Sequence, residues 1–367
     1  MTGLTVVAGQ IVALRLFDVA YAIDLKRAEA AWAGHATGRT ARPRLSGTPP
    51  KAVAFGVPPL DIALDPVSLD LDEGAVELAV TARLYEFGAV SLALRLPVVE
   101  RSWADYVHLA LALDRAVASG PWTQLLDHLR VVLAGAMERP AASALEEDYL
   151  FAVVQAFDTR LDATALMAQV DLVPLLSGEH RPLSEASRAE LLRSRFSYYA
   201  DDLVVLTWDR AFIYEPRGDS DVLDVLEVAN AQLLEMRYYD ELLDEELPRM
   251  YDLVETTRRG LNVLAARRYA GLARRLYTLV AEVTELTEKV DNALQVTEDV
   301  YLARVYTAAL ELFRVRTVSA AVDRKLSLIR DTYTALYDEA SSSRAELLEA
   351  AILLLILVEL VLALLRH

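Results

Sequence analysis

The sequence predicts an α+β protein, because strand-like and helix-like patterns occupy different parts of the chain. Before Asp219, apolar and polar residues alternate in several short runs. After it, apolar residues recur at steps of three and four, which is typical of paired long helices. We therefore expect an α+β body at 1–218 that can split into two subdomains near 140, a helical hairpin or coiled coil at 219–343, and a C-terminal hydrophobic helix at 344–367.

The N-terminal part should contain most of the strands. Leu4 to Leu25 reads as one or two strands, followed by a short helix around Asp24 to Trp32. The Gly- and Pro-rich residues 34–50 should form an exposed loop. The clearest signal is the alternation over 76–96, which predicts a β-hairpin turning near Phe87 and Gly88.

Helices should follow and cover one face of these strands. Ser102 with Asp105 predicts a helix start, and a second helix should run over 122–137. Ser143, with Glu146 three residues later, predicts another helix, and Asp162 and Ser184 should each cap one. Residues 203–214 then predict a second hairpin with Asp209 and Arg210 at its tip, after which no strand is expected.

The C-terminal half should be helical. Three heptad-like seams predict an antiparallel hairpin that self-associates into a homo-oligomer, and residues 295–316 interrupt the register. Pro248 should kink the first helix or start a new one. The seams are Val222, Leu226, Ala229, Leu233, Met236, Leu243, Leu247, Met250 and Val254; Leu272, Leu276, Leu279, Val283, Leu286, Val290 and Ala293; and Val322, Leu326, Ile329, Tyr333 and Leu336.

Residues 350–365 include 15 apolar residues among 16, and Glu359 is the exception. As a helix they would measure about 24 Å, against about 30 Å for the hydrocarbon core of a bilayer. We expect a single-pass C-terminal membrane anchor; the alternative is an oligomerisation helix. The residues assigned to the anchor are Arg344, Leu354, Glu359 and Arg366. Because Met1 to Val6 lacks a secretory signal, the body should lie on the cytoplasmic side.

Composition restricts the chemistry. The net charge of −17 does not favour direct binding of nucleic acid. The absence of cysteine excludes disulfides and thiolate ligands. The five histidines show no metal-binding spacing, and no phosphate-binding, dinucleotide-binding or serine-hydrolase motif occurs. We therefore expect no cofactor, no metal and no catalytic residues.

One polar cluster stands out on the first long helix. Its candidate interaction residues, with one position on the preceding hairpin that could be either core or the floor of a partner groove, are Asn230, Glu235, Arg237, Tyr238, Tyr239, Asp240 and Trp208. Intrahelical pairing and packing on the hairpin would explain them, and so would contact with a partner. The favoured function is a non-enzymatic, membrane-tethered scaffold that binds an unknown protein or ribonucleoprotein. The alternative is an enzyme with its site between the body and the acidic helix 222–254.

Three stretches resemble the "required for meiotic nuclear division protein one" family, a domain of unknown function. They are FSYYADDLVVLTWDRAFIYEP (Phe196 to Pro216), LEVANAQLLEMRYYDELLDEEL (Leu226 to Leu247) and RAELLEAAILLLILVELVLAL (Arg344 to Leu364). The resemblance implies a membrane-attached, coiled-coil protein, similar in its mitochondrial members to a complex-forming protein needed for organellar translation. It implies no transferable catalytic residue.

Overall fold

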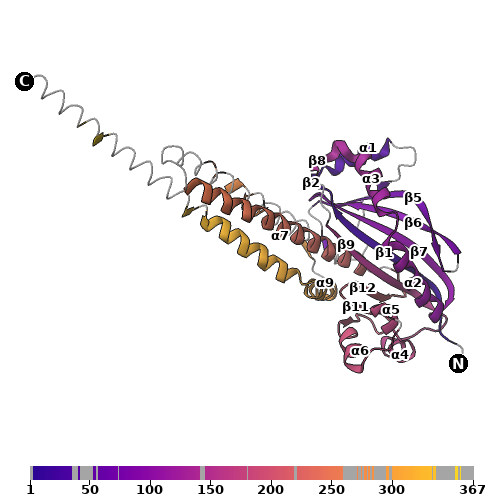
Figure 1. The fold of residues 1–367 in the computed structure, drawn as a ribbon. Coiled ribbons are helices and arrows are strands. Elements are labelled where there is room, and N and C mark those ends of the chain that lie inside the picture. Colours follow the sequence, from indigo (N-terminus) through magenta and orange to yellow (C-terminus); the bar gives the residue numbers. More distant parts are fainter. Residues whose placement is uncertain are drawn as a thin grey trace, which may run out of the picture. The chain divides into compact units, whose positions relative to one another are not determined.

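A computed structural model gives the fold (Figure 1). It describes residues 3–34, 40–41, 53–54, 57–72, 74–140, 145–179, 181–218, 221–258, 271, 274, 277–278, 280–281, 283–284, 295–296, 300–332, 334–335, 352–353 and 356. The chain divides into two compact units. Unit 1 comprises Met1–Tyr238 and Lys289–Arg316, and unit 2 comprises Tyr239–Glu288 and Thr317–His367.

Unit 1 is built on a nine-stranded mixed sheet in the order β10-β11-β12-β9-β1-β7-β6-β5-β3. Adjacent strands in this sheet are antiparallel, except β9 and β12, which are parallel to each other. The strands are β1 (Thr5–Asp18), β3 (Thr40–Ala41), β5 (Leu60–Leu71), β6 (Gly74–Leu84), β7 (Ala89–Ser102), β9 (Glu146–Phe157), β10 (Arg195–Phe196), β11 (Leu203–Leu206) and β12 (Arg210–Tyr214). Two small sheets pair β2 (Ala20–Ile23) with β8 (Met137–Pro140), and β4 (Val53–Ala54) with β13 (Gln295–Val296).

The two predicted hairpins are confirmed. β6 pairs with β7 around a turn at Tyr85–Gly88, and β11 pairs with β12 around a tip at Thr207–Asp209. The expectation of no strand after Asp219 is wrong, because β13 pairs with β4. Most of the predicted loop 34–50 lies outside the described residues, and its Thr40–Ala41 forms strand β3.

The helix predicted from Ser143 is wrong, because residues 146–157 form strand β9 between β1 and β12. Both faces of this strand are covered. Leu150, Ala152 and Val154 join the main core, while the alternate Tyr149 and Phe151 are buried on the other face. Burial on both sides gives a continuous apolar run instead of an alternating one, and such a run does not distinguish a strand from a helix.

Helices cover the face that carries the main core. They are α1 (Leu25–Ala33), α2 (Trp103–Ala118), α3 (Trp122–Leu133), η1 (Ala134–Ala136), α4 (Ala163–Gln169), α5 (Val173–Ser177) and α6 (Glu185–Leu191). The predicted caps are confirmed: the side chains of Ser102, Asp162 and Ser184 each accept a hydrogen bond from a backbone N–H of the first turn. Each cap satisfies a donor that the helix itself leaves unpaired.

The second face of the sheet is also covered, in contrast to the predicted one-sided arrangement. Helix α7 (Val222–Arg258) places its first part over this face, where Tyr85 donates a hydrogen bond to Glu227. From Val225 to Met236 all residues except the half-buried Gln232 are buried. Because this part of α7 is buried on all sides, its buried residues include polar ones as well as apolar ones. The first predicted seam therefore covers only part of the buried surface of α7.

Unit 2 contains the rest of α7 and the helical residues 317–332. Its buried residues include Leu243, Met250, Val322, Leu326 and Ile329, which belong to the first and third predicted seams. Lys325 bridges the carboxylates of Asp240 and Asp244 at 2.6 and 2.7 Å. Helix α7 continues through Pro248, so the predicted restart at that residue is wrong. Of the second seam, only Val283 lies among the described residues.

None of the helices in the described part of the chain is long and apolar enough to cross a membrane. The predicted anchor 350–365 lies outside the described residues except for Ile352, Leu353 and Ile356, whose side chains are exposed. Arg344, Leu354, Glu359 and Arg366 also lie outside them.

Candidate functional site: a groove at the edge of the sheet

A row of side chains crosses the second face of the sheet beneath α7. The strand register aligns Asp61 of β5, Arg83 of β6, Ser91 of β7, Leu16 of β1 and Glu147 of β9. Charged groups occupy three of these positions although α7 covers the face. The row therefore needs polar partners from the helix, because a buried charge is costly unless it is paired.

Helix α7 supplies those partners along its length. Arg83 donates to Asp224 at 2.7 Å and to Glu227 at 3.1 Å, and Arg237 pairs with Glu147. Ten helical residues between Glu227 and Arg237 span about 15 Å, and the three strand spacings between β6 and β9 span about 14 Å. The helix therefore runs across the strands, and its ion pairs fix its position on the sheet.

Burial dominates the electrostatics of this row. It raises the pKa of Glu227, which Arg83 partly opposes, and it raises the pKa of Tyr85 well above its usual range. Burial by itself would lower the pKa of Arg83, but the neighbouring carboxylates of Glu227 and Asp224 hold that pKa above the usual range. Asp61 completes the arrangement with bonds of 2.7 and 3.2 Å to the Arg83 guanidinium. The groups satisfy one another, which favours a role in stabilising the packing.

The residues of the predicted interaction cluster on α7 face different surroundings. Asn230, Glu235 and Tyr239 are buried, and the Asn230 amide donates to the Leu226 carbonyl within the helix. Arg237 pairs with Glu147 of the sheet, Tyr238 is half-buried, and Asp240 pairs with Lys325 in unit 2. The structure does not gather these side chains on one surface.

The remaining predicted residue, Trp208, lies at a large groove. The groove has a volume of about 1520 Å³ and lies within unit 1 between helices α5 and α6, strand β10, the β11–β12 tip and helix α9 (Val300–Leu312). Leu176, Leu191, Phe196 and Leu206 contribute apolar walls, and 66% of Trp208 is exposed. Residues separated by more than 100 positions in the sequence thus form one concavity.

Two aromatic contacts fix the direction of α9 along the groove. Near its start, the guanidinium of Arg304 lies 5.9 Å from the ring centre of Phe196 in β10. Just beyond its end, the ring of Phe313 lies 5.5 Å from that of Tyr149, whose hydroxyl donates to the Thr207 carbonyl at the hairpin tip. Helix α9 therefore runs from the β10 end of the groove to the β11–β12 tip.

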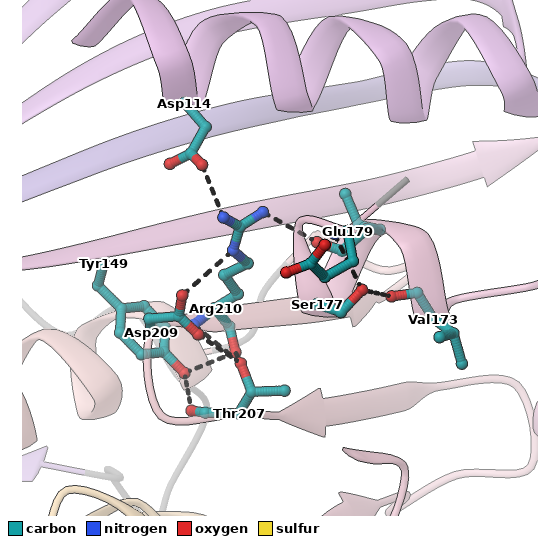
Figure 2. Close-up of polar contacts among 9 residues, drawn as sticks. Asp114, Tyr149, Val173, Ser177, Glu179, Thr207, Asp209 and Arg210 are labelled. Carbon is teal, nitrogen blue, oxygen red and sulfur yellow. Dashed lines mark hydrogen bonds and ion pairs between the residues drawn. The ribbon is translucent and has the colours of Figure 1, made fainter. Parts of the chain in front are cut away.

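Arg210 holds the tip of the hairpin in place (Figure 2). Its guanidinium donates to Asp114 of α2 at 2.7 Å, to the Leu175 carbonyl of α5 at 3.3 Å and to Asp209 at 3.3 Å. The carbonyl of Arg210 accepts hydrogen bonds from the hydroxyls of Tyr149 and Thr207. One cation thus joins two helices to the hairpin at this end of the groove.

Gly178 makes room for that cation. It ends α5 with a left-handed φ of 68°, and a Cβ at this position would lie 2.6 Å from the Arg210 guanidinium. The left-handed backbone conformation favours glycine here, and a larger residue would also have to displace the Arg210 guanidinium. The sequence signal for this arrangement is weak, because a glycine after a short helix is a common cap and does not identify the arginine that it faces.

The comparisons with known proteins concern the sheet domain. A family model described as "Uncharacterized protein MJ0711, N-terminal domain" matches residues 8–221. The uncharacterized protein MJ0711 of Methanocaldococcus jannaschii is 28% identical over 194 residues, which cover 53% of this chain and 58% of that protein. The chain thus matches somewhat over half the length of this curated relative. No solved structure matches.

These findings correct the predicted resemblance to the "required for meiotic nuclear division protein one" family, to which neither comparison points. Two of the three stretches that suggested it, at 226–247 and 344–364, lie outside the matched residues. Heptad spacing and an apolar terminus arise wherever helices pair or bury an apolar surface, so they do not identify a family. The match over 8–221 covers more than half of the chain, which therefore belongs to the family of the MJ0711 N-terminal domain.

Proposed function

We infer that this protein is a non-enzymatic scaffold whose groove in unit 1 receives a segment of a partner protein. The observation that carries this proposal is the groove itself. Its volume of about 1520 Å³ exceeds the roughly 300 to 1,000 Å³ of a small-molecule pocket. A peptide segment with several side chains would fill this volume better than a metabolite.

The walls of the groove suit a protein partner. Apolar side chains alternate with charged ones, and Trp208 is largely exposed at the groove. Tryptophan is enriched among residues that dominate binding energy, because it buries a large surface with little conformational freedom to lose. The Arg210 network ties the hairpin tip to α2 and α5, and such cross-linking should reduce the entropy that docking would cost.

A second copy of the chain is the partner that we propose for unit 2, which would self-associate as a coiled coil. Leu328 is 46% exposed, whereas Leu326 and Ile329 of the same helix are buried. Tyr251 of α7 is 51% exposed. These exposed side chains would be covered if helices of two copies packed together.

The groove proposal can be tested with a displayed library of random linear dodecapeptides selected against the full chain. Thr307 is exposed on α9 and lines the groove, so Thr307→Trp should place a bulky ring in the path of a bound segment at little cost to the fold. Thr123→Trp, at an exposed position of α3, is the matched control. We expect selected peptides to bind the parent and the Thr123 variant equally and to bind the Thr307 variant at least tenfold more weakly in fluorescence polarisation. If no enriched peptide distinguishes the two variants, the groove is not a docking site.

A further inference from the structure

The groove lies along the free edge of the nine-stranded sheet. Strand β10 is the end of the strand order, and Arg193, Ser194, Arg195 and Phe196 all line the groove. An edge strand presents backbone N–H and C=O groups that can pair with another strand. Strand β10 is two residues long, and the Arg195 N–H already donates to the Arg193 carbonyl at 3.1 Å, so a partner in this groove meets the free Arg195 carbonyl as well as side chains.

The pairing of β10 shows which backbone groups point into the groove. The Ser194 carbonyl accepts a hydrogen bond from the Leu206 N–H at 2.9 Å, and Arg195 and Phe196 stand opposite Val205 and Val204. In an antiparallel pair, successive residues direct their backbone groups to opposite sides. Because the Ser194 carbonyl points to β11, the Arg195 carbonyl points away from β11 and toward the groove.

Charges divide the groove into two ends. Arg195 and Arg304 lie at the end where Arg304 contacts Phe196. Glu179, Asp209 and Glu311 lie at the end formed by the hairpin tip. Within the described part of the chain, Arg195, Arg304 and Glu311 take part in no ion pair, so their charges are available to a ligand. Arg304 and Glu311 are separated by seven helical residues, or about 10 Å.

We propose that the groove binds an extended peptide segment of a partner protein as an additional strand on β10, antiparallel to it. This proposal rests on the proposed docking function. Strand β10 runs from the acidic end to the basic end, so an antiparallel peptide enters with its N-terminal part beside Arg304. The peptide therefore carries an acidic residue in its N-terminal part and a basic residue about three positions later, since a strand advances about 3.3 Å per residue. The residues between them alternate toward the apolar walls and toward solvent.

The peptides selected against the full chain serve as probes. The highest-affinity peptide is synthesised as a series in which one backbone nitrogen at a time is methylated, which removes one hydrogen-bond donor. A bound strand directs alternate N–H groups to its neighbour. Because β10 offers the Arg195 carbonyl as its free acceptor, we expect methylation of one central nitrogen to weaken binding at least tenfold and methylation of its two neighbours to leave the affinity within twofold. A series in which no single nitrogen is required in this way overturns strand addition, even if Thr307→Trp still weakens binding.

Charge reversal tests the direction of the bound peptide. Arg304→Glu should weaken binding of a peptide with an acidic N-terminal part at least tenfold, and exchanging its acidic residue for lysine should restore binding to that variant. Arg314→Glu, at an exposed position beyond α9, is the matched control and should leave the affinity unchanged. Equal effects of the two reversals, or a selected consensus with apolar residues at helical spacing, would overturn the proposed orientation and strand geometry. If the peptides do not bind in the groove at all, Thr307→Trp will leave their affinity unchanged. This outcome refutes the proposed docking function and is distinct from a failure of strand addition alone.

Discussion

Replacing Arg83 with methionine removes the cation that three carboxylates share beneath α7. The side chain is 13% exposed and donates to Asp61 at 2.7 and 3.2 Å, to Asp224 at 2.7 Å and to Glu227 at 3.1 Å. Glu227 is 3% exposed and would keep its burial while losing its positive partner. Breaking a buried ion pair from one side typically costs about 3 to 5 kcal/mol, because the remaining charge stays buried. We expect the free energy of unfolding to fall by about that amount at pH 8.

The loss should depend on pH in a defined direction. Burial already raises the pKa of Glu227, and removal of Arg83 raises it further because the arginine opposes that shift. Protonated Glu227 no longer needs a cation, so the loss should shrink as the pH falls toward 5. Urea unfolding followed by tryptophan fluorescence measures both values. Arg27→Met, which removes an exposed ion pair with Asp24, is the control and should change stability by about 0.5 kcal/mol or less. A loss below about 1 kcal/mol for Arg83→Met at pH 8 would refute the buried-network reasoning.

Two further predictions concern a buried acid and the helices of unit 2. Burial raises the pKa of Asp18 to about 7, with Arg130 opposing the shift, so the folded state takes up a proton that the unfolded state releases near pH 4. Ionisation of Asp18 should therefore lower the free energy of unfolding by about 4 kcal/mol in total as the pH rises from 4 to above 7. Asp18→Asn should remove this pH dependence when urea unfolding is measured at a series of pH values. If the variant keeps the same pH dependence, the pKa of Asp18 is not raised. Leu328→Asp should convert a self-associated chain to monomers in analytical ultracentrifugation. Ser327→Asp, at the neighbouring exposed position, is the control and should not. An unchanged sedimentation coefficient in both variants would exclude packing through Leu328.

Local signals predicted local structure well. The alternation over 76–96 and the hairpin at 203–214 correspond to β6, β7, β11 and β12, and the caps at Ser102, Asp162 and Ser184 are present. The same kind of signal gave a wrong prediction of a helix at Ser143. A serine followed three residues later by glutamate resembles a capping box, but the following residues pair with β1 and β12 within the sheet and are buried on both of its faces. Tertiary burial determines such a segment, and a local motif does not contain that information.

The groove could not be predicted from local patterns, because its walls come from 176–209 and from 300–312. One feature of the sequence did set the second wall of the groove apart from the long helices. The heptad register breaks over 295–316, and this is the stretch that belongs to unit 1 and supplies α9. A helix that packs on a sheet edge has no reason to keep the spacing of a coiled coil. The polar residues at 230–240 make different contacts: Asn230, Glu235 and Tyr239 are buried, while Arg237 and Asp240 form ion pairs with Glu147 and Lys325.

The strand order has a consequence for how the chain folds. Strand β1 pairs with β7 and β9, and β9 pairs in parallel with β12, so residues near the N-terminus complete their pairing with partners 129 to 151 positions later. Pairings of such long sequence separation slow folding, because the chain loses loop entropy before the contacts form. During synthesis, β1 therefore offers an unpaired edge until about residue 157 has emerged, and β9 offers one until about residue 214. A chain interrupted between these points exposes a long apolar strand edge, which is the kind of surface that aggregates.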